Sequence, residues 1–146
     1  MDAMETIKLG NTDMRIPKLG MGTWAIGGGP AWGDRDEQEC VTTIQKAVKS
    51  GLNLLDTAPA YNFGNSEKIV GKALEGLERK DVCLITKCGI VWTREGSLFN
   101  KVGDVQLYKN LSAESIRMEI EDSLKRLRTD YLDIYMTHWQ SVEPCF

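Results

Sequence analysis

The sequence lacks the features that indicate a membrane, nucleic-acid or metal-binding protein. No apolar run approaches the ~20 residues that cross a bilayer, and the amino terminus carries acids instead of the basic start and apolar run of a secretory signal. The net charge of −3 comes from interspersed acids and bases with no basic stripe, which argues against nucleic acid and anionic membrane surfaces. With a single histidine and no Cys-x-x-Cys pair, no metal site is expected.

The cysteines and the composition indicate one domain in a reducing compartment. Four cysteines could form two disulfides, but without an export signal we expect free thiols and a cytoplasmic location; they are Cys40, Cys83, Cys88 and Cys145. The chain of 146 residues contains 42% hydrophobic and 27% charged residues, which is ordinary for a globular protein. Residues 1–146 are therefore expected to form a single domain with its own core.

What the sequence does contain is strands that alternate with helices. A small β-hairpin is predicted over residues 6–17, followed by four strands at 18–24, 53–56, 82–87 and 131–138. The third strand is nearly all apolar, as if buried on both faces. Helices are predicted between the strands, with Asp34 or Asp36 capping the first, Asn65 or Ser66 the second and Ser112 the third. This alternation predicts right-handed βαβ units and a parallel sheet.

Two further stretches carry specific expectations. Residues 88–111 are polar and uneven in pattern, and they are expected to form a long loop. The third helix is expected to bury its apolar positions, which are Ile116, Ile120, Leu124 and Leu127.

One glycine motif resembles a dinucleotide-binding loop but fails its structural requirement. Gly20-x-Gly22-x-x-Ala25 fits the pattern Gly-x-Gly-x-x-Gly/Ala after a strand. That pattern needs a helix to open at once, so that its amino terminus faces the pyrophosphate. Residues 26–30, Ile-Gly-Gly-Gly-Pro, cannot form a helix, so we reject a Rossmann site.

Four polar side chains are expected to meet at one rim of the sheet. Asp56, Lys87 and His138 end the second, third and fourth predicted strands, and Tyr61 stands in the loop after Asp56. Taken alone, each has an ordinary explanation: a strand-end cap, a surface lysine, a structural histidine and a loop aromatic. Because the carboxyl ends of parallel strands face the same way, the fold brings all four together.

Together these four side chains suit proton donation by tyrosine. A free phenol ionises only near pH ~10, and a neighbouring cation favours the phenolate. Tyr61 beside Lys87 could therefore protonate a carbonyl oxygen as a hydride reaches the carbon, while Asp56 holds the lysine and His138 positions the carbonyl. No side chain can supply a hydride, so a nicotinamide cofactor is required.

At this point the sequence closely resembles the aldo-keto reductases, over residues 9 to 139. The resemblance implies an α/β fold of the eight-stranded (β/α) TIM-barrel type, with the first four β/α units and an amino-terminal β-hairpin present. It also implies NADP as cofactor, with NADPH preferred, and reduction of small aldehydes or ketones to alcohols. The matching segments are Gly20-Met21-Gly22-Thr23-Trp24, Asn53-Leu54-Leu55-Asp56-Thr57-Ala58-x-x-Tyr61, Gly64-x-Ser66-Glu67-x-x-Val70-Gly71-x-Ala73-Leu74, Thr86-Lys87 and Ser123-Leu124-x-Arg126-Leu127-x-Thr129-Asp130-Tyr131-Leu132-Asp133-x-Tyr135-x-x-His138-Trp139.

The resemblance also assigns residues to roles. Asp56, Tyr61, Lys87 and His138 match the family's catalytic tetrad, with Tyr61 as proton donor. The segment that flanks the nicotinamide is matched by Gly22, Thr23 and Trp24, together with Asp56. The family's substrate pocket is matched by Trp32, Trp92 and Trp139.

The length departs from the family, because a full barrel runs to ~250 residues or more. We expect a half barrel truncated after the fourth strand, which is weak or inactive as a lone chain. It would act as a homo-oligomer or with a complementary second-half chain, since two unpaired sheet edges need covering. The alternative is a non-catalytic binding or self-associating protein that keeps the fold.

Overall fold

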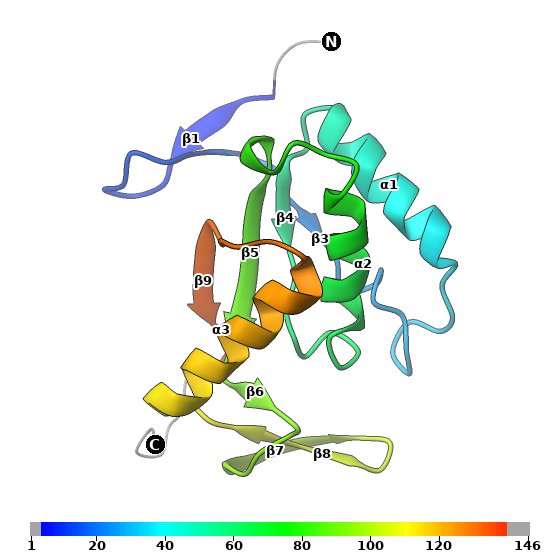
Figure 1. Ribbon diagram of the computed structural model, residues 1–146, viewed down its shortest axis with the longest axis vertical. Coiled ribbons are helices and arrows are strands. Elements are labelled where there is room, and N and C mark those ends of the chain that lie inside the picture. Colours follow the sequence, from blue (N-terminus) through cyan, green and yellow to red (C-terminus); the bar gives the residue numbers. More distant parts are fainter. Residues whose placement is uncertain (1–3, 140–146) are drawn as a thin grey trace.

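The computed structural model describes residues 4–139 (Figure 1). Three α-helices and nine β-strands follow one another along this part of the chain, with one 3-10 turn at Arg79–Asp81. The elements are β1 (Thr6–Lys8), β2 (Arg15–Pro17), β3 (Met21–Gly22), α1 (Glu37–Lys49), β4 (Leu54–Asp56), α2 (Asn65–Leu74), β5 (Cys83–Cys88), β6 (Ile90–Val91), β7 (Ser97–Val102), β8 (Val105–Lys109), α3 (Ala113–Leu127) and β9 (Ile134–Thr137).

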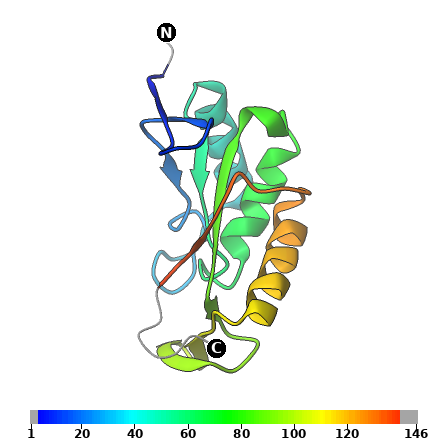
Figure 2. The ribbon, with the colours of Figure 1, turned by 90° about the vertical axis from the view of Figure 1, so that its left-hand side faces the viewer.

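A four-stranded parallel sheet forms the centre, in the order β3-β4-β5-β9. Each neighbouring pair is joined by one crossover helix, so α1, α2 and α3 lie on one face of the sheet (Figures 1 and 2). The antiparallel hairpin of β1 and β2 lies at the amino-terminal end of the parallel strands. The predicted hairpin and parallel sheet are both confirmed.

The hydrophobic core lies between this sheet and its helices. Alternate strand residues face the helices, and Leu55, Leu84 and Thr86 are fully buried there. Fully burying a leucine-sized side chain contributes about 1.5–3 kcal/mol. The other face of β5 carries Ile85 and Lys87, and Ile85 is only half-buried. The expectation that the third strand is buried on both faces is therefore wrong for Ile85, because all three helices pack on the other side of the sheet (Figure 2).

Two of the predicted helix caps are confirmed. The Asp36 side chain caps α1 by accepting the Glu39 N–H at 2.7 Å, and Ser112 caps α3 by accepting the Ser115 N–H at 3.2 Å. Helix α1 is followed by Gly51 at φ +96°, a left-handed conformation that glycine adopts without strain. Helix α2 differs from the prediction, because its N-cap is Gly64 at φ +82° and no side chain caps it.

A buried ion pair joins α2 to α3. The Glu67 carboxylate is fully buried, accepts a hydrogen bond from Arg126 Nε at 2.6 Å and another from Thr86 Oγ1 at 2.6 Å. The two helices approach closely at Gly71, where a Cβ atom would collide with the backbone oxygen of Arg126. The position of α3 over the sheet therefore depends on the Glu67–Arg126 ion pair and on the absence of a side chain at Gly71.

The buried face of α3 is more polar than predicted. Only Leu127 of the expected apolar stripe is buried, and Ile116, Ile120 and Leu124 are half-buried. The residues that face inward instead are Ser115, Glu119 and Ser123. Glu119 accepts hydrogen bonds from the Gly89 N–H at 2.9 Å and from Ser115 Oγ at 3.0 Å. These hydrogen bonds orient the helix, and periodicity alone did not reveal them.

Residues 88–111 form a second sheet, which corrects the prediction of a long loop. Strands β6, β8 and β7 pair antiparallel in that order, beyond the carboxyl ends of the parallel strands (Figure 1). Strands β7 and β8 are joined by Gly103 and Asp104, a two-residue connection with Gly103 at φ +58°. The sheet was missed because polar residues interrupt both strands, although a two-residue Gly-Asp connection indicates a hairpin.

The three cysteines within residues 4–139, Cys40, Cys83 and Cys88, are free thiols as predicted, and Cys145 lies outside the described residues. In the same range, no helix has the length and apolar character needed to cross a membrane.

The buried ion pair generates a stability prediction. Arg126→Ala leaves the Glu67 carboxylate buried without its cation, and breaking such a pair costs about 3–5 kcal/mol. Arg128→Ala removes the partner of Glu75, but both of those side chains are substantially exposed. Exposed pairs contribute about 0–1 kcal/mol. We expect urea unfolding to show a several-fold larger loss of unfolding free energy for Arg126→Ala than for Arg128→Ala. Similar losses in the two variants would contradict this assignment.

Candidate active site

Lys87 is the centre of a polar cluster at the carboxyl ends of the parallel strands. The residue is 8% exposed. The ammonium donates hydrogen bonds to Asp56 Oδ1, to the Thr57 carbonyl oxygen at 2.9 Å and to Tyr61 Oη at 3.1 Å. An ammonium has three donors, so all three are used. The cluster thus offsets the cost of burying a charge, which an unpaired lysine could not do.

The sheet register explains why these residues meet. Asp56 ends β4 and lies beside Ile85 of β5, so Lys87 stands two residues further along on the same face. Residues two apart on a strand share one face of the sheet. This face points away from the helices, which keeps Asp56 and Lys87 out of the hydrophobic core.

Tyr61 is held by an unusual turn between β4 and α2. The three residues after it, Asn62, Phe63 and Gly64, all have positive φ angles of 50°, 51° and 82°. A left-handed conformation is rare for a bulky residue such as Phe63 and costs of order 1–3 kcal/mol. The Asn62 side chain compensates by donating to the Gly27 carbonyl oxygen at 2.9 Å. This strained turn places the Tyr61 phenol against Lys87.

His138 follows β9 and faces Tyr61 edge-on. Their ring centroids are 5.5 Å apart with an interplanar angle of 82°. The pKa of His138 is lowered from 6.5 to about 4, first because burial disfavours the imidazolium and second because the Lys87 ammonium repels it. The Asp56 carboxylate opposes both effects. His138 is therefore neutral at physiological pH and keeps one ring N–H as a hydrogen-bond donor.

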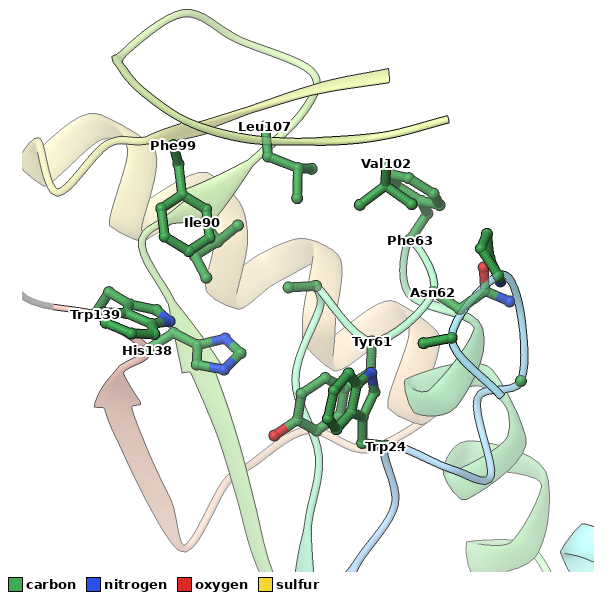
Figure 3. Close-up of a pocket in the computed structure, with 14 residues that line it drawn as sticks. Trp24, Tyr61, Asn62, Phe63, Ile90, Phe99, Val102, Leu107, His138 and Trp139 are labelled. Atoms are coloured by element: carbon green, nitrogen blue, oxygen red, sulfur yellow. The ribbon is translucent and has the colours of Figure 1, made fainter. Parts of the chain in front are cut away.

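A cavity of about 450 Å³ opens beside Tyr61 and His138 (Figure 3). Its polar lining includes these two side chains and Asn62, and none of the described residues that line it carries an acidic group, an ammonium or a guanidinium. Most of its walls are apolar, and they include Trp24, Phe63, Ile90, Phe99, Leu107 and Trp139. The size and character are those of a site for a small organic molecule.

Sequence and structure comparisons place this geometry in a family. Residues 18–143 match the family described as "Aldo/keto reductase family". The chain belongs to the aldo/keto reductase family. It is 66% identical over 144 residues to the NADH-specific methylglyoxal reductase of Escherichia coli (strain K12), covering 98% of this chain and 44% of that protein. It is also 42% identical over 137 residues to an aldo-keto reductase of Bacillus subtilis (strain 168), covering 93% of this chain and 38% of that one.

Solved structures of aldo-keto reductases resemble the fold. The holo form of the enzyme from Bacillus halodurans matches with a TM-score of 0.78 and 32% identity, covering 97% of this chain and 42% of that one. An aldo/keto reductase from Klebsiella pneumoniae, solved with NADP and acetate, matches with a TM-score of 0.68 and 30% identity. The TIM-barrel type of fold is confirmed, with the four parallel strands as part of such a barrel. The chain spans about 40% of these relatives' length.

The residues expected to flank a nicotinamide differ from one another in their surroundings. Gly22 pairs with Asp56 in the sheet, and a Cβ atom added there would meet nothing within 4 Å. Trp24 lines the cavity and stacks on Tyr61, with ring centroids 6.1 Å apart. The Thr23 side chain is instead fully buried, and its hydroxyl contacts Ser66 Oγ at 2.7 Å. Gly22 thus leaves room beside Asp56 and Trp24 borders the cavity, whereas the Thr23 hydroxyl ties the segment after β3 to α2.

The three tryptophans expected to line the substrate pocket are separated. Trp139 lines the cavity. Trp32 packs edge-on against Trp24, with ring centroids 5.4 Å apart, and lies behind the lining. Trp92 packs against Phe63 and faces a different, smaller pocket. Their contact with substrate stays a prediction.

Sequence reasoning missed one wall of the cavity. Phe99, Val102 and Leu107 belong to strands β7 and β8, within the stretch read as a loop. The signal that could have found them is the Gly103-Asp104 connection between two valines. Among residues 4–139, no group of three or more acidic, histidine or cysteine side chains could hold a metal ion.

The neutral state of His138 can be measured directly, because it is the single histidine of the chain. We expect its NMR imidazole signals to titrate with a midpoint near pH 4, well below 6.5. In Lys87→Met the midpoint should rise but stay below 6.5, because burial is the larger cause. A midpoint at 6.5 in the folded protein would contradict the burial of the ring.

The same shift has a consequence for stability. The unfolded chain takes up a proton on its histidine as pH falls below 6.5, but the folded chain does so only near pH 4. His138 therefore lowers the free energy of unfolding as pH falls from 6.5 to 4. Above pH 6.5 it causes no such loss. His138→Gln should show a smaller loss between pH 6.5 and 4 in urea unfolding.

Proposed function

We propose that the protein reduces aldehydes or ketones to alcohols, with Tyr61 as the proton donor and a nicotinamide cofactor as the hydride source. The observation that carries the proposal is the Lys87 ammonium, which is hydrogen-bonded to both Asp56 and Tyr61. A tyrosine with a buried cation at its oxygen, at the edge of an apolar cavity, suits proton transfer to a carbonyl. Membership of the aldo/keto reductase family supports the same reaction.

Each residue of the cluster has one task in this reaction. The substrate carbonyl oxygen accepts a hydrogen bond from the neutral His138 imidazole, which orients it toward Tyr61. Tyr61 transfers its phenolic proton to that oxygen, and the Lys87 ammonium stabilises the phenolate that forms. Asp56 keeps the ammonium in place. When bound, the cofactor supplies the hydride to the carbonyl carbon, so the C=O bond becomes C–H and O–H.

The cofactor would lie along the open side of β3. Gly22 leaves space beside Asp56, and Trp24 borders the same cavity as Tyr61. The family resemblance implied NADPH, but the relative with 66% identity is named NADH-specific. We therefore propose NADH as the preferred cofactor of this protein. Comparing the binding of NADH and NADPH tests this choice.

The substrate would be a small carbonyl compound. The described cavity walls carry no acidic, ammonium or guanidinium group to neutralise a charged substrate. The name of the same relative points to methylglyoxal, which is small and neutral. Methylglyoxal is therefore the first substrate to assay.

Tyr61→Phe tests the proton donor. Removing one hydroxyl should lower kcat for methylglyoxal reduction with NADH by about 10²–10⁴-fold, the usual value of general acid catalysis. Lys87→Met should also lower kcat, because it removes the cation that stabilises the phenolate. Tyr131→Phe is the control, because Tyr131 is 42% exposed and stacks on Arg79 before β9 begins. Wild-type turnover in Tyr61→Phe would remove tyrosine as the acid.

Gly22→Val tests the cofactor position. The valine would project into the space beside Asp56, so we expect NADH to bind at least about tenfold more weakly, equivalent to ~1.4 kcal/mol. Because glycine destabilises a strand by roughly 0.5–1 kcal/mol relative to alanine, the variant should be no less stable than the wild type. Nicotinamide fluorescence measures the binding, and urea unfolding measures the stability. Unchanged NADH affinity would place the cofactor elsewhere.

A further inference from the structure

We propose that Phe99 selects the substrate, by packing its ring against a flat apolar group carried by the carbonyl carbon. This makes aromatic aldehydes and aryl 2-oxoaldehydes the preferred substrate class. The inference rests on the proposed function for its kinetic test, but it also predicts a binding preference that needs no turnover.

A β-bulge in β7 aims Phe99 at the cavity. Leu98 pairs with Tyr108 and Asn100 pairs with Leu107, which leaves Phe99 as an extra residue without a partner in β8. Bulges next to active sites commonly redirect a side chain. Phe99 lines the cavity, whereas its neighbour Leu98 is 76% exposed.

The ring of Phe99 is held by two contacts on the described chain. Its centroid lies 5.6 Å from that of Trp139, at an interplanar angle of 50°. The Lys109 ammonium lies 5.0 Å from the Phe99 centroid and 5.5 Å from the Trp139 centroid. Such cation–π and aromatic contacts fix a ring before a ligand arrives, so binding does not have to order it.

The position of the proton donor orients the substrate in the cavity. In the proposed reaction the carbonyl oxygen lies at Tyr61 and His138, which supply a phenol and an imidazole on one side of the cavity. Phe99 and Leu107 lie across the cavity from Tyr61, so the substituent on the carbonyl carbon meets them (Figure 3). A methyl group leaves most of this apolar wall uncovered, whereas a phenyl group can stack on it.

The kinetic test uses two substrates that differ in one group, methylglyoxal and phenylglyoxal. Phe99→Ala should lower kcat/KM for phenylglyoxal about tenfold and change that for methylglyoxal by less than about twofold, since aromatic stacking and apolar burial are lost only for the phenyl group. Phe99→Leu keeps apolar bulk without the flat ring, and its kcat/KM for phenylglyoxal should lie between those of Phe99→Ala and the wild type. Leu98→Ala is the matched control from the same strand and should behave like the wild type. If Phe99→Ala lowers kcat/KM equally for both substrates, or leaves that for phenylglyoxal unchanged, the inference is overturned.

The binding test separates this inference from the proposed function. Benzyl alcohol cannot accept a hydride, and its ring should shift the NMR signals of the single histidine, His138, when it occupies the cavity. We expect Phe99→Ala to bind benzyl alcohol about fivefold more weakly than the wild type and Leu98→Ala, with ethanol giving no comparable shift. Equal binding in all three proteins, or no shift in the wild type, contradicts a role for Phe99. If binding depends on Phe99 but Tyr61→Phe leaves turnover unchanged, the proposed proton donor fails and the aromatic site stands.

Discussion

The buried ammonium of Lys87 is the constraint on which the site depends. A lysine that is 8% exposed is tolerated only because three oxygens surround it, and these come from Asp56, Thr57 and Tyr61. The first two are set by the end of β4 and its register with β5, and the third by the strained turn after Tyr61. The cation in turn helps to keep His138 neutral. The geometry of the polar cluster therefore depends directly on the local folding of β4, β5 and the turn after Tyr61.

The two faces of the parallel sheet have different roles. The helix side carries the hydrophobic core and the Glu67–Arg126 pair, which fixes α3 against α2. The other side carries Asp56 and Lys87, with their cluster. Thr86 and Lys87 show the division most clearly, because these adjacent residues of β5 point in opposite directions, one toward Glu67 and one toward Tyr61. Strand β5 therefore contributes to the hydrophobic core on one face and to the polar cluster on the other.

The sequence predicted the polar cluster because it depends on simple rules. Asp56, Lys87 and His138 were placed by strand ends alone, since parallel strands finish at one rim. The face of α3 could not be predicted in the same way, because the buried Glu119 is satisfied by the backbone of Gly89, which is distant in sequence. Phe99 was missed for a similar reason. Its direction depends on a bulge in the pairing of β7 with β8, and pairing register is a property of two strands together.

The charges of the site have a further consequence for how the proposed substrate would arrive. Asp56 and Lys87 are oppositely charged and in contact, His138 is neutral, and no acidic, ammonium or guanidinium group is found among the described residues that line the cavity. Electrostatic fields accelerate the capture of charged ligands, and the proposed substrate is neutral. Encounter with a neutral carbonyl compound will be governed by diffusion and by contact with the apolar walls. Its association rate should change little with ionic strength, because salt screens only interactions between charges.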